Sequence, residues 1–154
     1  MNMVGKYLVH KEMKEVVVSR WLQAKHFDLR CVNILAPMFN MTLNVAYGSY
    51  DEFKKFLKKE FDVDTEHKNA MAMVVTFEHE NVCWHWMNIQ KNDWTAEDYG
   101  VLAHELHHFT HFSLKEKGIT YGEAGEELYA YFQGYFIELV VRAFAQLHKT
   151  QKKK

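Results

Sequence analysis

Residues 95–117 have the sequence TAEDYGVLAHELHHFTHFSLKEK, which predicts one long helix. Thr95 followed three positions later by Asp98 is typical of a helix start, because the two side chains can bond backbone N–H groups that the first turn leaves without partners. Gly118 supplies the C-terminal stop. Four of the ten histidines of the chain fall within residues 104–111, so this helix is the most informative segment of the sequence.

His104 and His108 lie four positions apart, so on a helix their imidazoles project from the same face and can share one metal ion. Glu105 completes the pattern H-E-x-x-H. Zinc bound by two imidazoles and a third protein ligand keeps a position open for water, and an adjacent carboxylate can take the proton of that water. The spacing predicts one Zn²⁺ per chain with Glu105 as catalytic base. Manganese, cobalt and nickel stay open, since such a site accepts several metals.

Two other patterns that share these residue types are excluded by their neighbours. The metzincin pattern needs a histidine at Leu114 and a glycine at His111, and the inverted pattern H-x-x-E-H needs a glutamate at His107. His107 and His111 are a second pair four positions apart, but His108 follows His107, so this pair lacks an adjacent carboxylate. It is the weaker site.

A last long helix is predicted from about residue 122 to residue 148, and it carries candidates for the third ligand near its start. Successive helical residues are turned by about 100°, so Glu126 and Glu127 cannot both face one ion. Glu123 shares a face with Glu127 but lies a turn earlier, where the chain need not yet be helical. We choose Glu127.

This arrangement resembles the gluzincin-type zincin metallopeptidases, in which H-E-x-x-H on one helix is completed by the glutamate of E-x-x-A on the next. The run EELYAYFQGY at residues 126–135 looks like small metallopeptidases encoded by bacteriophages and bacterial mobile elements. The resemblance covers residues 82–135, and the first eighty residues match no family that we can name. The matching residues are His104, Glu105, His108, Glu127 and Ala130.

The resemblance implies a zinc hydrolase, specifically a peptidase acting on peptide or protein substrates. Zinc would polarise the scissile carbonyl and its bound water, Glu105 would pass the water proton to the leaving amine, and Glu127 would hold the metal. A donor to the oxyanion is also expected, although each candidate is equally suited to packing or to supporting a ligand. These candidates are Tyr121, Tyr131, His111 and His85.

In zincins an edge strand ahead of the active helix pairs with extended substrates, and residues 82–89 with Trp84, His85 and Trp86 are the equivalent candidate here. A tryptophan-rich strand packed under the helices is the alternative.

The first ninety-four residues are expected to be mainly sheet with one helix. Ser49 and Glu52 have the capping-box spacing, and apolar residues recur with helical period over residues 50–61. Glu78-His79-Glu80-Asn81 separates two strand-like runs as in a β-hairpin. Sheet first and two long helices after predict an α+β fold. The predicted strands are residues 41–47, 71–77 and 82–89.

The 154 residues suit a single zincin-like domain, with the sheet portion at 1–94, two metal-site helices at 95–148 and a flexible basic tail at 149–154. The 19 basic and 20 acidic residues leave no footprint for nucleic acid or an anionic membrane. No signal peptide or membrane span is indicated. Two isolated cysteines, Cys31 and Cys83, suggest reduced thiols and a cytoplasmic protein.

A different class of function stays open: a metal-stabilised interaction protein without turnover. In such a protein Glu105 would be dispensable, whereas the metal ligands would not.

Overall fold

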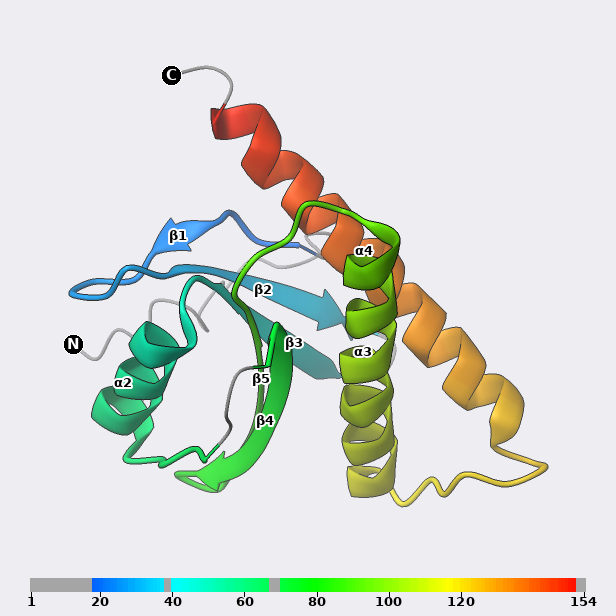
Figure 1. Cartoon of the computed structure of the whole chain (residues 1–154). Coiled ribbons are helices and arrows are strands. Elements are labelled where there is room, and N and C mark those ends of the chain that lie inside the picture. The colour runs from blue at the N-terminus through cyan, green and yellow to red at the C-terminus, as the bar shows by residue number, and fades with distance from the viewer. Residues whose placement is uncertain (1–17, 38–39, 67–69, 152–154) are drawn as a thin grey trace. The chain divides into compact units, whose positions relative to one another are not determined.

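The computed structural model describes residues 18–37, 40–66 and 70–151 (Figure 1). The chain forms two compact units, residues 1–92 and 93–154, and each is described by itself. This boundary lies close to the predicted change from sheet to helices after residue 94. The N-terminal segment, where no signal peptide is predicted, and residues 152–154 of the basic tail lie outside the described residues.

The first unit is built on a five-stranded mixed sheet with the order β1-β2-β3-β5-β4. The fold class is therefore α+β, as the sequence predicts. Only the β3–β5 pairing is parallel, and the other neighbours are antiparallel. The strands are β1 (Leu22–Gln23), β2 (Arg30–Ala36), β3 (Met41–Tyr47), β4 (Ala72–His79) and β5 (Val82–Ile89).

The predicted hairpin is confirmed as β4 and β5, and its turn is tighter than expected. Only Glu80 and Asn81 separate the strands, and both have positive φ, 51° and 62°. Two such residues form the primed turn whose twist matches that of paired strands. Thr76 is the register partner of His85 in this hairpin, so the two side chains lie on the same face of the sheet.

The helix α2 (Tyr50–Phe61) follows β3, and its predicted start is confirmed in part. The Ser49 hydroxyl accepts a hydrogen bond from the backbone N–H of Glu52. The Glu52 carboxylate accepts from the backbone N–H of Asp28 and from Lys55, so it ties the helix to an earlier loop. These two bonds, with the Lys55 bond the largest cause, hold the pKa of Glu52 below its ordinary value.

The core of the first unit lies between α2 and one face of the sheet. Trp86 is the largest fully buried side chain, and its ring contacts the rings of Phe53, Phe56 and Phe61 at centroid distances of 6.3, 5.0 and 6.1 Å. Trp84 contacts Phe61 at 4.9 Å. Burial of such aromatic clusters is a major source of folding free energy.

The prediction of a substrate-binding edge strand at residues 82–89 is wrong. β5 lies between β3 and β4, so its backbone is already paired on both sides from Trp86 onward. Trp84 and Trp86 are 5% and 1% exposed and pack against α2. The structure shows the alternative, a packed, tryptophan-rich strand. Trp84 and Trp86 are two positions apart, so both indoles lie on the face of the sheet that α2 covers.

The second unit consists of α3 (Ala96–Glu116) and α4 (Glu126–Gln151), which lie side by side in Figure 1. The predicted start of α3 is confirmed with both halves of the capping box between Thr95 and Asp98. The Asp98 carboxylate accepts hydrogen bonds from the backbone N–H groups of Thr95 and Asp93. Because this carboxylate is buried, the cap also fixes the chain that enters the helix.

The last helix starts four residues later than predicted and extends three residues further. Residues 122–125 form a turn in which the Gly125 N–H donates to the Gly122 carbonyl, and a side chain at Gly125 would collide with the Thr120 carbonyl at 2.5 Å. A glycine is therefore required at this approach. At the other end Lys149, predicted to begin a flexible tail, belongs to α4. None of the helices in the described part of the chain is long and apolar enough to cross a bilayer.

Aromatic rings and one amide hold α3 and α4 together. Phe109 contacts Phe132 and Phe136 at centroid distances of 5.6 and 4.7 Å, and all three rings are fully buried. The Gln133 side-chain amide donates to the Ala103 carbonyl at 2.9 Å. The contacts fix both the spacing of the helices and their position along each other.

Candidate metal centre

The two predicted histidine ligands lie together on the exposed side of α3. The Nε2 atoms of His104 and His108 are 3.1 Å apart, and their rings are 4.8 Å apart between centroids. Both side chains are exposed, whereas Leu106 and Phe109 on the other side of the helix are fully buried. The buried side anchors the turn that carries the histidines.

The separation of the two nitrogens suits a shared metal ion. Two nitrogens that each lie about 2.0–2.1 Å from a tetrahedral zinc ion are about 3.3–3.4 Å apart. The observed 3.1 Å is close to this value, so little movement would bring both lone pairs onto one ion. The same distance also suits an N–H···N hydrogen bond between the rings, with one nitrogen protonated.

Glu105 lies between the two histidines in the chain and is half-buried. Its neighbour Leu106 is buried, and the Thr110 hydroxyl donates to the Leu106 carbonyl at 2.7 Å. The turn that carries Glu105 is thus held from inside the unit. A carboxylate in this setting can accept a proton from a water held beside it.

Gln133 is a contact residue of this site that the sequence analysis did not single out. It donates to the Ala103 carbonyl, directly before His104, and its Oε1 lies 3.4 Å from Nδ1 of His107. Its amide therefore connects α4 to the histidine-bearing turn of α3. In the sequence, the one indication of this role was that Gln133 lies among the apolar residues of the last predicted helix.

Glu127, the predicted third ligand, lies exposed in the first turn of α4. Among the described residues of the second unit, no third histidine, cysteine or carboxylate places a ligand atom within 4.8 Å of both imidazole nitrogens. Glu126 is also exposed, and Glu123 lies in the turn before the helix, as expected. The choice of Glu127 over its neighbours stays a prediction.

The four candidates for the oxyanion donor are spread over the chain. Tyr121 is exposed in the turn before α4 and packs edge-on against Tyr129, with 5.1 Å between ring centroids. Tyr131 is 56% exposed on α4, and His111 is exposed on α3. His85 belongs to β5 in the first unit and is buried. Of the four candidates, Tyr131 is the one carried by the same helix as Glu127.

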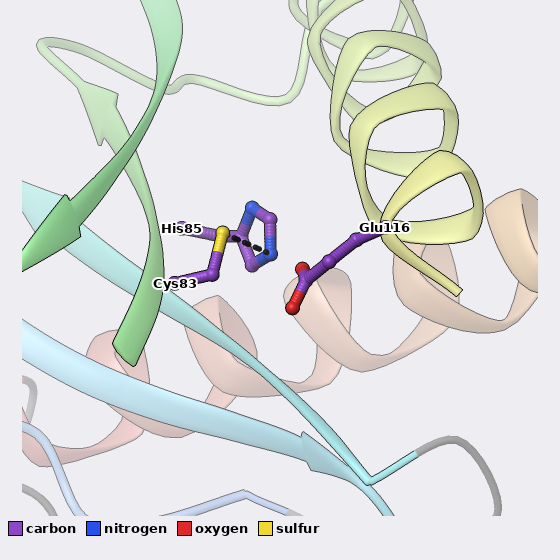
Figure 2. Close-up of side chains that lie close together, drawn as sticks. All are labelled: Cys83, His85 and Glu116. Carbon is purple, nitrogen blue, oxygen red and sulfur yellow. Dashed lines mark hydrogen bonds between the residues drawn. The ribbon is translucent and has the colours of Figure 1, made fainter. Parts of the chain in front are cut away.

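His85 has polar neighbours of its own on the β4–β5 hairpin. Its Nδ1 lies 3.0 Å from the Thr76 hydroxyl, and its Nε2 lies 3.8 Å from the Cys83 sulfur (Figure 2). The sequence signal for this group was a cysteine and a histidine two positions apart on a strand, which places both on one face. Glu116, the third residue drawn in Figure 2, belongs to α3 in the second unit.

Comparisons with known proteins identify no relative: no protein-family model, no curated protein and no solved structure matches this chain.

Proposed function

We propose that this chain is a zinc-dependent hydrolase of the peptidase class, with His104 and His108 as metal ligands and Glu105 as general base. The observation that carries the proposal is the 3.1 Å separation of the two Nε2 atoms on the exposed side of an anchored helix. The resemblance of the H-E-x-x-H and E-x-x-A segments to gluzincins supports the same chemistry.

Each residue of the site would have a separate role in hydrolysis. Zinc bound at this pair would supply a polarised water and a Lewis acid for the substrate carbonyl. Glu105 would accept the proton of the attacking water and deliver it to the leaving amine, so that it ends the reaction in its starting state. Glu127 would contribute a negatively charged oxygen ligand, which requires its carboxylate to approach the histidine pair.

The substrate is proposed to be an unfolded or extended peptide. Because β5 is an inner strand of the sheet, we assign no strand to substrate binding. Tyr131 is the preferred oxyanion donor among the four candidates, because it is exposed and follows Glu127 by about one helical turn.

The test uses fluorescently labelled casein as substrate and the full chain loaded with zinc. Glu105→Gln should abolish hydrolysis while zinc content, measured by elemental analysis, stays at one ion per chain. The amide keeps the side-chain shape but cannot accept the water proton. Glu97→Gln changes an exposed glutamate in the first turn of the same helix and should leave hydrolysis unchanged.

The outcome also separates the two classes of function. Hydrolysis by Glu105→Gln at the parental rate contradicts the general-base assignment. A chain that binds zinc through His104 and His108 but cleaves no casein supports the metal-stabilised interaction protein instead.

A further inference from the structure

The β4–β5 hairpin brings a thiol, an imidazole and a hydroxyl into one line of contacts. Cys83 and His85 project from the same face of β5, and Thr76 is the register partner of His85 on β4. Figure 2 shows the sulfur of Cys83 and the ring of His85 turned toward one another. All three residues belong to the first unit.

The contacts match the arrangement that activates a nucleophile: a base within reach of the nucleophile, and a third group that orients the base. A proton on Nδ1 of His85 would be donated to the Thr76 hydroxyl oxygen, 3.0 Å away. The lone pair of Nε2 would then face the Cys83 thiol at 3.8 Å, a distance suited to a bond with sulfur. His85 is 3% exposed, so its ring is held in this orientation.

The other cysteine of the chain, Cys31, lies in an apolar environment. Cys31 is 1% exposed in the core between the sheet and α2, and burial raises the pKa of its thiol to about 12. Cys83 is half-buried, and neither cysteine forms a disulfide. One chain thus carries an inert thiol and a thiol paired with a base.

We propose that Cys83, His85 and Thr76 form a reactive thiol centre that is modified by small disulfides. In this step the Cys83 thiol gives its proton to Nε2 of His85, and the thiolate attacks one sulfur of the disulfide. A bond forms between the two sulfurs and the original S–S bond breaks. The leaving thiolate takes the electron pair and then the proton from His85. Cys83 is oxidised to a mixed disulfide, and the other half of the reagent is reduced to a thiol.

The expected gain in rate follows from the thiolate fraction. An ordinary thiol is roughly 3% thiolate at pH 7. If half of the thiol were ionised, the thiolate fraction would be about 16-fold higher. A more acidic thiol gives a less nucleophilic thiolate, so the rate per thiolate would be about four- to fivefold lower. A net gain of about three- to fourfold over an ordinary exposed thiol remains.

The test measures the reaction of the full chain, reduced and treated with a chelator, with an aromatic disulfide that releases a coloured thiolate. Mass spectrometry assigns the modified cysteine. At pH 7 Cys83 should react at least threefold faster than the same cysteine in the urea-unfolded chain, and Cys31 should not react in the folded chain. His85→Gln and Thr76→Val should each slow Cys83 at least threefold, the second by releasing the base from its orientation.

One control variant makes the result specific. His79→Gln changes the other histidine of the hairpin and should leave the rate unchanged. If His85→Gln loses its far-ultraviolet circular dichroism, Thr76→Val decides, because valine keeps the shape of threonine and favours strands. A Cys83 rate unchanged by the loss of the hydroxyl or the imidazole overturns the proposal. So does a folded-chain rate below that of the unfolded chain.

Discussion

Replacement of Gln133 by leucine tests how the histidine-bearing turn of α3 is held. Gln133 is half-buried, and its amide makes two contacts across the helix pair: a 2.9 Å bond to the Ala103 carbonyl and a 3.4 Å contact with Nδ1 of His107. Leucine has a similar size and retains most of the apolar packing, so the substitution removes mainly the polar contacts. The variant therefore isolates the contribution of one amide to the α3–α4 interface.

The size of the effect can be worked from these two contacts. A well-formed hydrogen bond between neutral groups contributes about 0.5–1.5 kcal/mol, and the 2.9 Å bond belongs in this class. The 3.4 Å contact is at the long end of the range and adds at most a few tenths of a kcal/mol. The Ala103 carbonyl can keep a bond within its own helix, so no large penalty for an orphaned acceptor is added. We expect a destabilisation of about 0.5–2 kcal/mol.

Urea unfolding followed by far-ultraviolet circular dichroism measures the free energy of unfolding of parent and variant. Gln146→Leu is the matched control, because Gln146 is an exposed glutamine later on the same helix. If Gln133→Leu is no less stable than the Gln146→Leu variant, the amide does not connect the helices, and the reasoning from these contacts is refuted.

Three further predictions concern the same unit. His104→Ala or His108→Ala should each remove the zinc found by elemental analysis and, with it, about 2.7 kcal/mol of stabilisation at a metal concentration of 100 Kd; full retention of zinc in both would contradict the site. Glu127→Ala should weaken zinc binding in a calorimetric titration and abolish casein hydrolysis, whereas Glu126→Ala should do neither. Phe109→Ala should lower the free energy of unfolding by about 3–5 kcal/mol, since it empties the aromatic contact between the helices; a loss below 1 kcal/mol would exclude that contact as a main support.

The elements that follow local rules were predictable from the sequence. Thr95 and Asp98 cap α3 because a helix start needs side-chain acceptors wherever it occurs. The β4–β5 hairpin follows from two strand-like runs close together in the chain. The His104–His108 pair belongs here too, since the helical period alone sets the two rings side by side.

The features that depend on distant segments were not predictable in this way. The parallel pairing of β3 with β5 joins strands separated by α2 and β4, and no local pattern specifies it. That pairing is what removes β5 from the edge of the sheet. The Glu52 carboxylate likewise serves a distant N–H, that of Asp28, where the local rule expects it to cap its own helix. The Cys83–His85 pair is completed by Thr76 from β4, so the spacing of Cys83 and His85 in the sequence did not predict the group.

Which residue can serve as the third metal ligand depends on the register of α4 along α3. Sequence patterns within one helix do not specify this register. The two helices run antiparallel, since Trp94 ahead of α3 contacts Phe144 late in α4, whereas Gln133 meets Ala103 further along α3. Glu127 precedes Gln133 by six residues, or about 9 Å of helix. Its backbone is therefore level with a part of α3 beyond His108, and its carboxylate has to reach back toward the pair. Gln133 contributes to this register together with the Phe109 contacts, so Gln133→Leu should lower zinc affinity as well as stability if Glu127 is a ligand. A zinc affinity that is unaltered in Gln133→Leu but lost in His104→Ala would argue against a third ligand on α4.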